Sequence, residues 1–119
     1  MARTALTVTT TAAAGTVLPA AAAVDNVNGN QFTNTGRELI EINNADSSSH
    51  TATFITNGVY SVGSVQYAIS DLIVTITNGT SKVCGPFDKV LFNDGTNNVD
   101  VDWSSATGMT ARVISLGAG

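Results

Sequence analysis

The sequence of 119 residues holds one cysteine, Cys84, and one histidine, His50, and this scarcity limits its chemistry. A single cysteine cannot form an intrachain disulfide, and one histidine with one cysteine falls short of the ligands of a zinc site. Charged residues make up only 12% of the chain, the net charge is −4, and the basic residues are scattered: Arg3, Arg37, Lys82, Lys89 and Arg112. Without a basic stripe, we expect no nucleic-acid partner. No apolar run approaches the roughly 20 residues of a membrane-spanning helix, so we expect no membrane partner either.

The abundant residue types are those that favour strands and turns. Hydrophobic residues make up 43% of the chain, and they are mostly small or β-branched. Threonine, serine, asparagine and glycine fill most of the remainder, which favours strands and tight turns over helices. The length suits one domain with its own core.

The stretch from Ile69 to Val101 carries the clearest pattern. Over residues 72–77 one face would carry Leu72, Val74 and Ile76 and the other Ile73, Thr75 and Thr77, which is typical of a half-buried strand. Asn78-Gly79 predicts a tight hairpin turn, which would return the chain over Ser81 to Cys84. Gly85-Pro86 breaks the run, Val90 to Phe92 reads as a further short strand, and Asn93-Asp94-Gly95 predicts another turn. The expectation is a β-meander with the rest of the chain added as strands.

Further strands are expected on both sides of this meander. They cover residues 3–11, 37–43 and 51–56, the less regular stretch 59–66, and the final segment 109–116. In the strand 37–43, Leu39 faces opposite to Ile40 and Ile42, and in the strand 51–56 Ala52 and Phe54 share a face. Short strands about ten residues apart, with no helical period, predict an all-β protein. We expect a single antiparallel β-sandwich, Ig-like or jelly-roll-like, or a small barrel.

The first 31 residues differ from the rest. An expected strand is followed by alanine-rich stretches, Thr16-Val17-Leu18-Pro19 and the polar turn sequence 25–30. A signal peptide is disfavoured because the middle is threonine-rich and lacks a compact apolar core. We therefore expect an N-terminal strand and extended arm over residues 1–31 and the β-sandwich domain over residues 32–119.

Catalytic and metal-binding patterns are weak. His50 lies in an expected loop after a serine run, and no serine has a nucleophile-elbow context, so we expect no catalytic residue and no enzyme activity. Asp94, Asp100 and Asp102 form the only acidic concentration, and with Asn97 or Asn98 their oxygens could bind Ca²⁺. However, the spacing fits no EF-hand loop, and alternating outward aspartates are ordinary in an amphipathic strand. No metal and no cofactor is therefore the favoured expectation.

Three other positions have a structural and a functional interpretation. Asn78-Gly79-Thr80 matches a glycosylation sequon, but the same residues suit the turn. Trp103 continues the face of Val99 and Val101, which favours a core residue over a sugar-stacking platform. Cys84 in an expected strand is predicted to be a small apolar residue rather than a reactive thiol.

Five short motifs, in order along most of the chain, carry a resemblance. They are A-R-T-A-L-T-V (Ala2 to Val8), N-G-N-Q-F-T-N-T-G-R (Asn28 to Arg37), C-G-P-F (Cys84 to Phe87), N-D-G-T-N-N-V-D-V-D (Asn93 to Asp102) and the closing T-A-R-V-I-S-L. Together they resemble the small tailed-bacteriophage capsid decoration (cement) or head accessory proteins. The chain departs from that pattern in a longer and less regular stretch from Asn57 to Ser70.

The resemblance implies a structural virion protein that binds the outside of the assembled capsid and stabilises it. It implies the major capsid protein as partner, a homotrimer at three-fold or quasi-three-fold positions, and location on the capsid surface after a host cytoplasmic stage during assembly. Alternatives are a head–tail connector or tail protein, or a carbohydrate-binding or adhesion module at the virion surface. Under the first function, the arm from Ala2 to Ala23 is expected to make capsid or inter-subunit contacts. The residues proposed for these contacts are Arg3, Leu6, Val8, Val17, Leu18 and Arg37.

Overall fold

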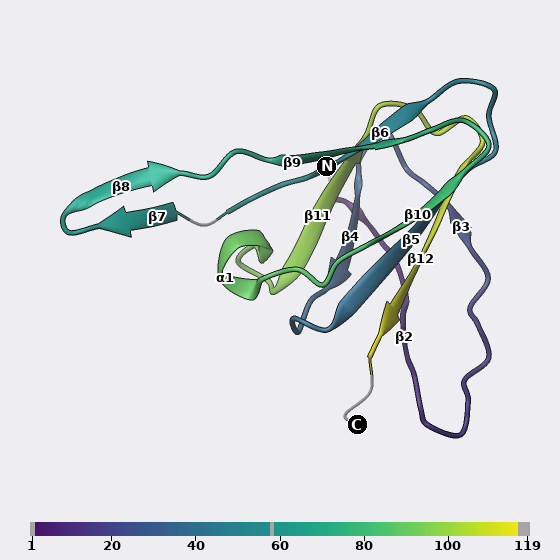
Figure 1. The fold of residues 1–119 in the computed structure, drawn as a ribbon, viewed down its shortest axis with the longest axis horizontal. Coiled ribbons are helices and arrows are strands. Elements are labelled where there is room, and N and C mark those ends of the chain that lie inside the picture. Colours follow the sequence, from purple (N-terminus) through teal and green to yellow (C-terminus); the bar gives the residue numbers. More distant parts are fainter. Residues whose placement is uncertain (1, 58, 117–119) are drawn as a thin grey trace.

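The computed structural model describes residues 2–57 and 59–116, and it is nearly all β, as the sequence predicts (Figure 1). Two five-stranded sheets pack face to face as a sandwich. The first sheet consists, in spatial order, of β1 (Thr4–Ala5), β4 (Asn30–Thr33), β11 (Asn98–Trp103), β6 (His50–Phe54) and β9 (Leu72–Ile76). The second consists of β10 (Ser81–Cys84), β5 (Glu38–Asn44), β12 (Met109–Ser115) and β2 (Val8–Thr10), with β3 (Ala22–Ala23) also paired to β12.

A two-stranded hairpin and one short helix complete the fold. The hairpin consists of β7 (Val59–Val62) and β8 (Val65–Ala68), and it projects away from both sheets (Figure 1). It extends the antiparallel pair of β6 and β9, since β7 follows β6 and β8 leads into β9. The helix is α1 (Lys89–Phe92).

The core follows from alternation along the central strands. In β5, Ile40 and Ile42 are buried while Leu39 is not, and in β6 Ala52 and Phe54 point inward together, as predicted. The buried side chains of both sheets form one cluster, in which the Phe54 and Phe87 rings lie 4.8 Å apart between centroids. Each such side chain contributes about 1.5–3 kcal/mol of transfer free energy, so this cluster stabilises the sandwich.

The meander predicted over residues 69–101 is wrong in its pairing. β9 pairs with β6 in the first sheet, and β10 pairs with β5 in the second, so the chain crosses between sheets at Asn78-Gly79. The turn itself is present, with Thr80 N–H donating to Thr77 O at 3.1 Å. Gly79 has a φ of 72°, but Asn78 does not adopt positive φ. The primed geometry that joins two strands of one sheet is therefore absent, and Gly79 N–H instead donates to Asn44 O at the end of β5.

Two local predictions also need correction. The short strand predicted at Val90 to Phe92 is the helix α1, which begins because the Asp88 carboxylate accepts a hydrogen bond from Val90 N–H at 2.8 Å. His50, predicted in a loop, is the first residue of β6. The less regular stretch 59–66 forms β7, the turn at residues 63–64 and the start of β8.

The sheets are mixed rather than purely antiparallel, because the N-terminal segment adds parallel strands to both. β1 runs parallel to β4 and β2 runs parallel to β12, while β3 pairs antiparallel with β12. Between β1 and β2, Leu6 enters the core, and Val24 follows β3 into the same cluster. The segment predicted as an extended arm thus lies along the edges of both sheets, apart from the connection between β2 and β3.

Candidate functional site

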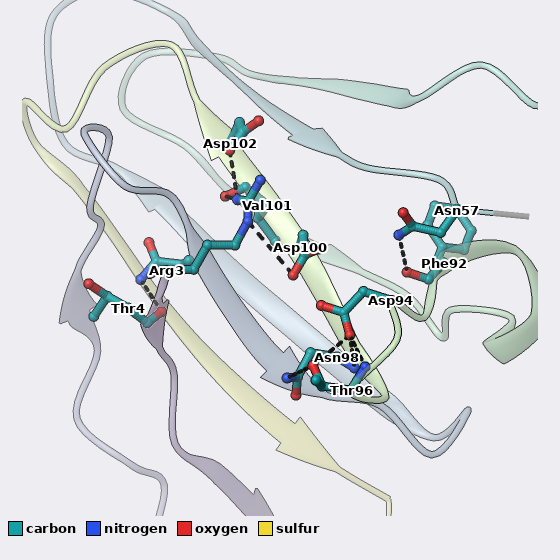
Figure 2. Close-up of polar contacts among 11 residues, drawn as sticks. Arg3, Thr4, Asn57, Phe92, Asp94, Thr96, Asn98, Asp100, Val101 and Asp102 are labelled. Carbon is teal, nitrogen blue, oxygen red and sulfur yellow. Dashed lines mark hydrogen bonds and ion pairs between the residues drawn. The ribbon is translucent and has the colours of Figure 1, made fainter. Parts of the chain in front are cut away.

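The strongest polar constellation joins the N-terminal segment to β11 (Figure 2). The Arg3 guanidinium donates from Nη1 to Asp102 Oδ1 at 2.7 Å and to Val101 O at 3.1 Å, and its Nε lies 3.8 Å from Asp100 Oδ1. Gly29 lies directly beneath this group at a φ of 78°, and a Cβ there would collide with Arg3 Nη1. In the sequence analysis Arg3 and the aspartates had separate roles, and the structure brings these side chains together.

Asp94 and Asp100 form a coupled pair of carboxyl groups beside Arg3. Burial raises the pKa of Asp100 to about 6, the Asp94 carboxylate adds to this effect, and Arg3 opposes it. Burial would also raise the pKa of Asp94, but hydrogen bonds outweigh it and lower that pKa. The Asp94 Oδ1 atom accepts from Thr96 N–H at 2.8 Å, from the Thr96 hydroxyl at 2.7 Å and from Asn98 N–H at 3.1 Å. Asp94 is therefore ionised near neutral pH, whereas Asp100 binds a proton below about pH 6 and loses it as the pH rises above that value.

This geometry does not assemble the calcium site considered for Asp94, Asp100 and Asp102. Asp94 Oδ1 is occupied by three donors, and Asp102 Oδ1 is bound by the Arg3 guanidinium, which itself supplies the positive charge. Among the residues that the structure describes, no group of three or more His, Cys, Asp or Glu side chains could hold a metal ion. The constellation instead fastens the N-terminal segment to the sheet.

His50 pairs with an acid. Its Nε2 lies 2.7 Å from Asp46 Oδ2, and this contact is the first cause of a lowered pKa of Asp46. A hydrolase of the Ser-His-Asp type also needs a serine hydroxyl against the second ring nitrogen. Within residues 2–57 and 59–116, the hydrogen bond found for His50 goes to Asp46 and not to a serine. The dyad therefore anchors the loop before β6 to the first residue of that strand.

Trp103 is a core residue, as predicted. It is buried, and its Nε1–H donates to Asn30 Oδ1 at 2.8 Å. Asn30 is itself fully buried, accepts from Asp25 N–H at 2.9 Å and donates to Thr4 O at 3.1 Å. One asparagine side chain thus joins β1, the turn at residues 25–28 and β11.

Cys84 packs partly against the core, and burial raises the pKa of its thiol. A thiol with a raised pKa is a poorer nucleophile at neutral pH, in line with its predicted packing role.

Asn78 of the sequon is exposed within the turn between the two sheets.

The residues predicted to contact a capsid or another subunit are divided by burial. Leu6 is buried and Val8 packs partly against the core, so both contribute to this chain's own sandwich. Val17 and Leu18 lie in the connection between β2 and β3, where Val17 is 90% exposed. Arg37 is exposed immediately before β5. A contact with other proteins stays a prediction for all of them.

Comparison with known proteins found no matching family model, no similar curated protein and no similar solved structure. Within the part of the chain that the structure describes, no helix is long and apolar enough to cross a membrane.

An exposed apolar surface lies elsewhere, on strands that the sequence did not assign to a site. Leu72 and Ile73 are exposed on β9, and Val62 and Val65 are exposed at the tip of the hairpin. We call these four residues the apolar ridge. A signal for it exists in the sequence, because residues 51–81 contain a single charged side chain, Asp71. The Val62 and Val65 pair at the hairpin tip and the Leu72 and Ile73 pair on β9 are two separate places where exposed apolar side chains could contact another protein.

Proposed function

We propose that the protein is a structural component of a tailed-phage virion that binds the outside of the assembled capsid and stabilises the shell. The resemblance in five ordered motifs supports this proposal, together with the way the folded chain connects those motifs. The first motif contributes Arg3 and the fourth contributes Asp100 and Asp102, and these side chains join in one constellation. Phe87 of the third motif lies in the aromatic core.

The observation that carries the proposal is the apolar ridge, whose side chains are exposed on β9 and at the tip of the hairpin. A capsid accessory protein works through a stable body and a contact surface that is repeated over many copies. A protein that binds only the assembled shell shifts the equilibrium towards that shell by linkage. Weak contacts become strong when several copies engage one lattice together. The resemblance implies three copies around a lattice three-fold axis, with the major capsid protein as partner.

The direct test uses shells prepared without the protein. Purified protein is added to them, and the bound copies and the temperature at which the shells release their DNA are measured. We expect saturable binding and a higher release temperature. Shells that bind none of the protein, or whose release temperature is unchanged at saturation, would refute the proposal.

The contact surface is tested with paired variants. We expect the double variant Val62→Asp and Val65→Asp, at the hairpin tip, to lower the number of copies bound to the shell, because it places two charges on the apolar ridge. Both side chains are about half exposed, so the variant should keep its fold. Val17→Asp with Leu18→Asp tests the connection between β2 and β3 in the same way. Deletion of residues 2–23 is not a suitable test, because it removes Leu6 from the core. Two further measurements separate the alternatives. A ring at the tail vertex in electron micrographs would indicate a connector or tail protein, and binding to a glycan array would indicate an adhesion module.

A further inference from the structure

The sequence contains three Asn-Gly pairs, at residues 28–29, 57–58 and 78–79. An asparagine before a glycine is prone to lose its side-chain amide, because glycine has no side chain to hinder attack by its own backbone nitrogen. Whether a given pair reacts in a folded protein depends on how firmly its two residues are held. Gly58 lies outside the described residues, so the structure allows a comparison of Asn28 with Asn78.

The pair at Asn78-Gly79 is open to solvent. Both residues are exposed, and a Cβ added at Gly79 would meet no atom within 4 Å. The Asn78 backbone N–H donates to Ser49 Oγ at 3.3 Å, but in the described parts of the chain the Asn78 side-chain amide has no hydrogen-bond partner. This side chain is therefore free to turn towards the Gly79 nitrogen, and water can reach both groups.

The pair at Asn28-Gly29 is held on every side. Asn28 Nδ2 donates to Asp25 Oδ2 at 3.2 Å, and the Asn28 backbone N–H donates to Asp25 Oδ1 at 3.0 Å. Gly29 is buried beneath the Arg3 guanidinium, and its carbonyl oxygen accepts from Thr4 N–H at 3.0 Å. A reaction at Asn28 would therefore require the N-terminal segment to leave the sheet.

Two backbone hydrogen bonds hold the turn at Asn78. Gly79 N–H donates to Asn44 O at 2.9 Å, and Thr80 N–H donates to Thr77 O at 3.1 Å. The Gly79 nitrogen must lose its proton in order to react, so its bond to Asn44 has to open first. Opening of an exposed turn costs much less free energy than opening of a core element. This bond therefore slows a reaction at Asn78 without preventing it.

We propose that Asn78 is a site of spontaneous deamidation in the folded protein. The Gly79 backbone nitrogen gives its proton to a base in the solvent and attacks Cγ of Asn78. The bond between nitrogen and Cγ forms, the bond between Cγ and Nδ2 breaks, and ammonia leaves. Water then opens the cyclic imide at one of its two carbonyl groups. Hydrolysis at Cγ gives aspartate, and hydrolysis at the backbone carbonyl gives isoaspartate, whose main chain runs through the side-chain carbons.

The product changes the chain where it crosses from β9 in the first sheet to β10 in the second. Either product adds one negative charge to a chain whose net charge is −4. Isoaspartate also adds one atom to the main chain next to the hydrogen bond between Gly79 and Asn44, so it should loosen this crossing. The inference goes beyond the proposed function, because the reaction needs neither a capsid nor another partner. In copies that stay in a particle without being replaced, the modified fraction would grow with the age of the particle.

The test compares the two asparagines in the folded and the unfolded chain. The full chain is kept at 37 °C and pH 8, in buffer and in concentrated urea, and tandem mass spectrometry locates aspartate and isoaspartate at each position over time. In urea both pairs react at the rate of an unfolded chain. In the folded protein we expect Asn78 to react within about tenfold of its rate in urea, and Asn28 to be slowed about a hundredfold or more.

The matched variant is Arg3→Gln, which removes the guanidinium above Gly29. We expect it to speed the reaction at Asn28 and to leave that at Asn78 unchanged, with circular dichroism to check the fold. The proposal is overturned if folding slows both asparagines of the wild type to the same degree, because the reaction would then require the whole chain to unfold. It is also overturned if Asn78 stays intact in the folded protein while it is converted in urea, or if Arg3→Gln speeds both positions equally.

Discussion

Replacement of Asp100 by asparagine should stabilise the protein at neutral pH, although it removes a partner of Arg3. The folded protein raises the pKa of Asp100 from 3.8 to about 6, first through burial and then through Asp94. Folded chains therefore hold a proton between about pH 4 and pH 6 that unfolded chains have already lost. Stability consequently falls as the pH rises through this window, and the full cost remains at pH 7. Asparagine has the shape of the protonated acid and can still donate to Asp94.

The size of the effect follows from the pKa. At about 1.4 kcal/mol for each pH unit, the change from 3.8 to about 6 sets an upper limit of about 3 kcal/mol at neutral pH. Asp100 is 14% exposed and lies near Arg3 and Asp102, so screening by water reduces this limit. We expect Asp100→Asn to raise the free energy of unfolding at pH 7 by about 1–2 kcal/mol, or the melting temperature by roughly 4–8 °C.

The assay is urea unfolding of both proteins at a series of pH values from 4 to 8. The difference between the variant and the wild type should grow as the pH rises from 4 to about 7 and then stay constant. Asp102→Asn is the control on the same strand. Its carboxylate is 52% exposed and bound to Arg3, so its loss should destabilise by less than about 1 kcal/mol. An Asp100→Asn protein that is no more stable than the wild type at pH 7, or a difference that does not vary with pH, would refute the reasoning.

Three further perturbations test other parts of the structure by denaturant unfolding. Gly29→Ala should destabilise by about 1–3 kcal/mol, because the new methyl group meets Arg3 at a positive φ; Gly15→Ala, also at positive φ but with no atom nearby, should cost less. Trp103→Phe removes a buried N–H donor and leaves its acceptor with one partner fewer, at a cost of about 1–3 kcal/mol. Burial would raise the pKa of Glu38, but hydrogen bonds lower it. The Glu38 carboxylate therefore stabilises the fold above about pH 4.5, and this contribution is lost as the pH falls further. In Glu38→Gln the free energy of unfolding should decrease less between about pH 4.5 and lower pH than it does in the wild type.

The sequence predicted the sandwich and its buried faces because alternation depends on local periodicity alone. Ile40, Ile42, Ala52 and Phe54 take the positions that their spacing indicates. Strand pairing could not be predicted in the same way. The turn at Asn78-Gly79 satisfies its local rule, but the hydrogen bond to Asn44 that directs the chain into the other sheet comes from a residue far away in sequence.

The candidate sites show the same division. The acidic residues around Asp100 were recognised, with calcium as a disfavoured alternative, but their ion-pair partner Arg3 lies almost the whole chain length away and could not be foreseen. Trp103 was correctly predicted as a core residue, although its bond to Asn30 could not be foreseen. The apolar ridge was missed because alternation places Ile73 on one face of its strand without showing that this face meets solvent.

The position of β12 has a consequence for how this protein is made. This strand ends at Ser115, yet it lies inside the second sheet, where it pairs with β5, β2 and β3. During synthesis, β2 and β3 have no neighbour in that sheet until β12 has left the ribosome. Such long-range pairing makes folding slow and leaves strand edges open in the nascent chain. Completion of the sandwich therefore waits for β12, and a chain that stops before Met109 should be found in aggregates or degraded.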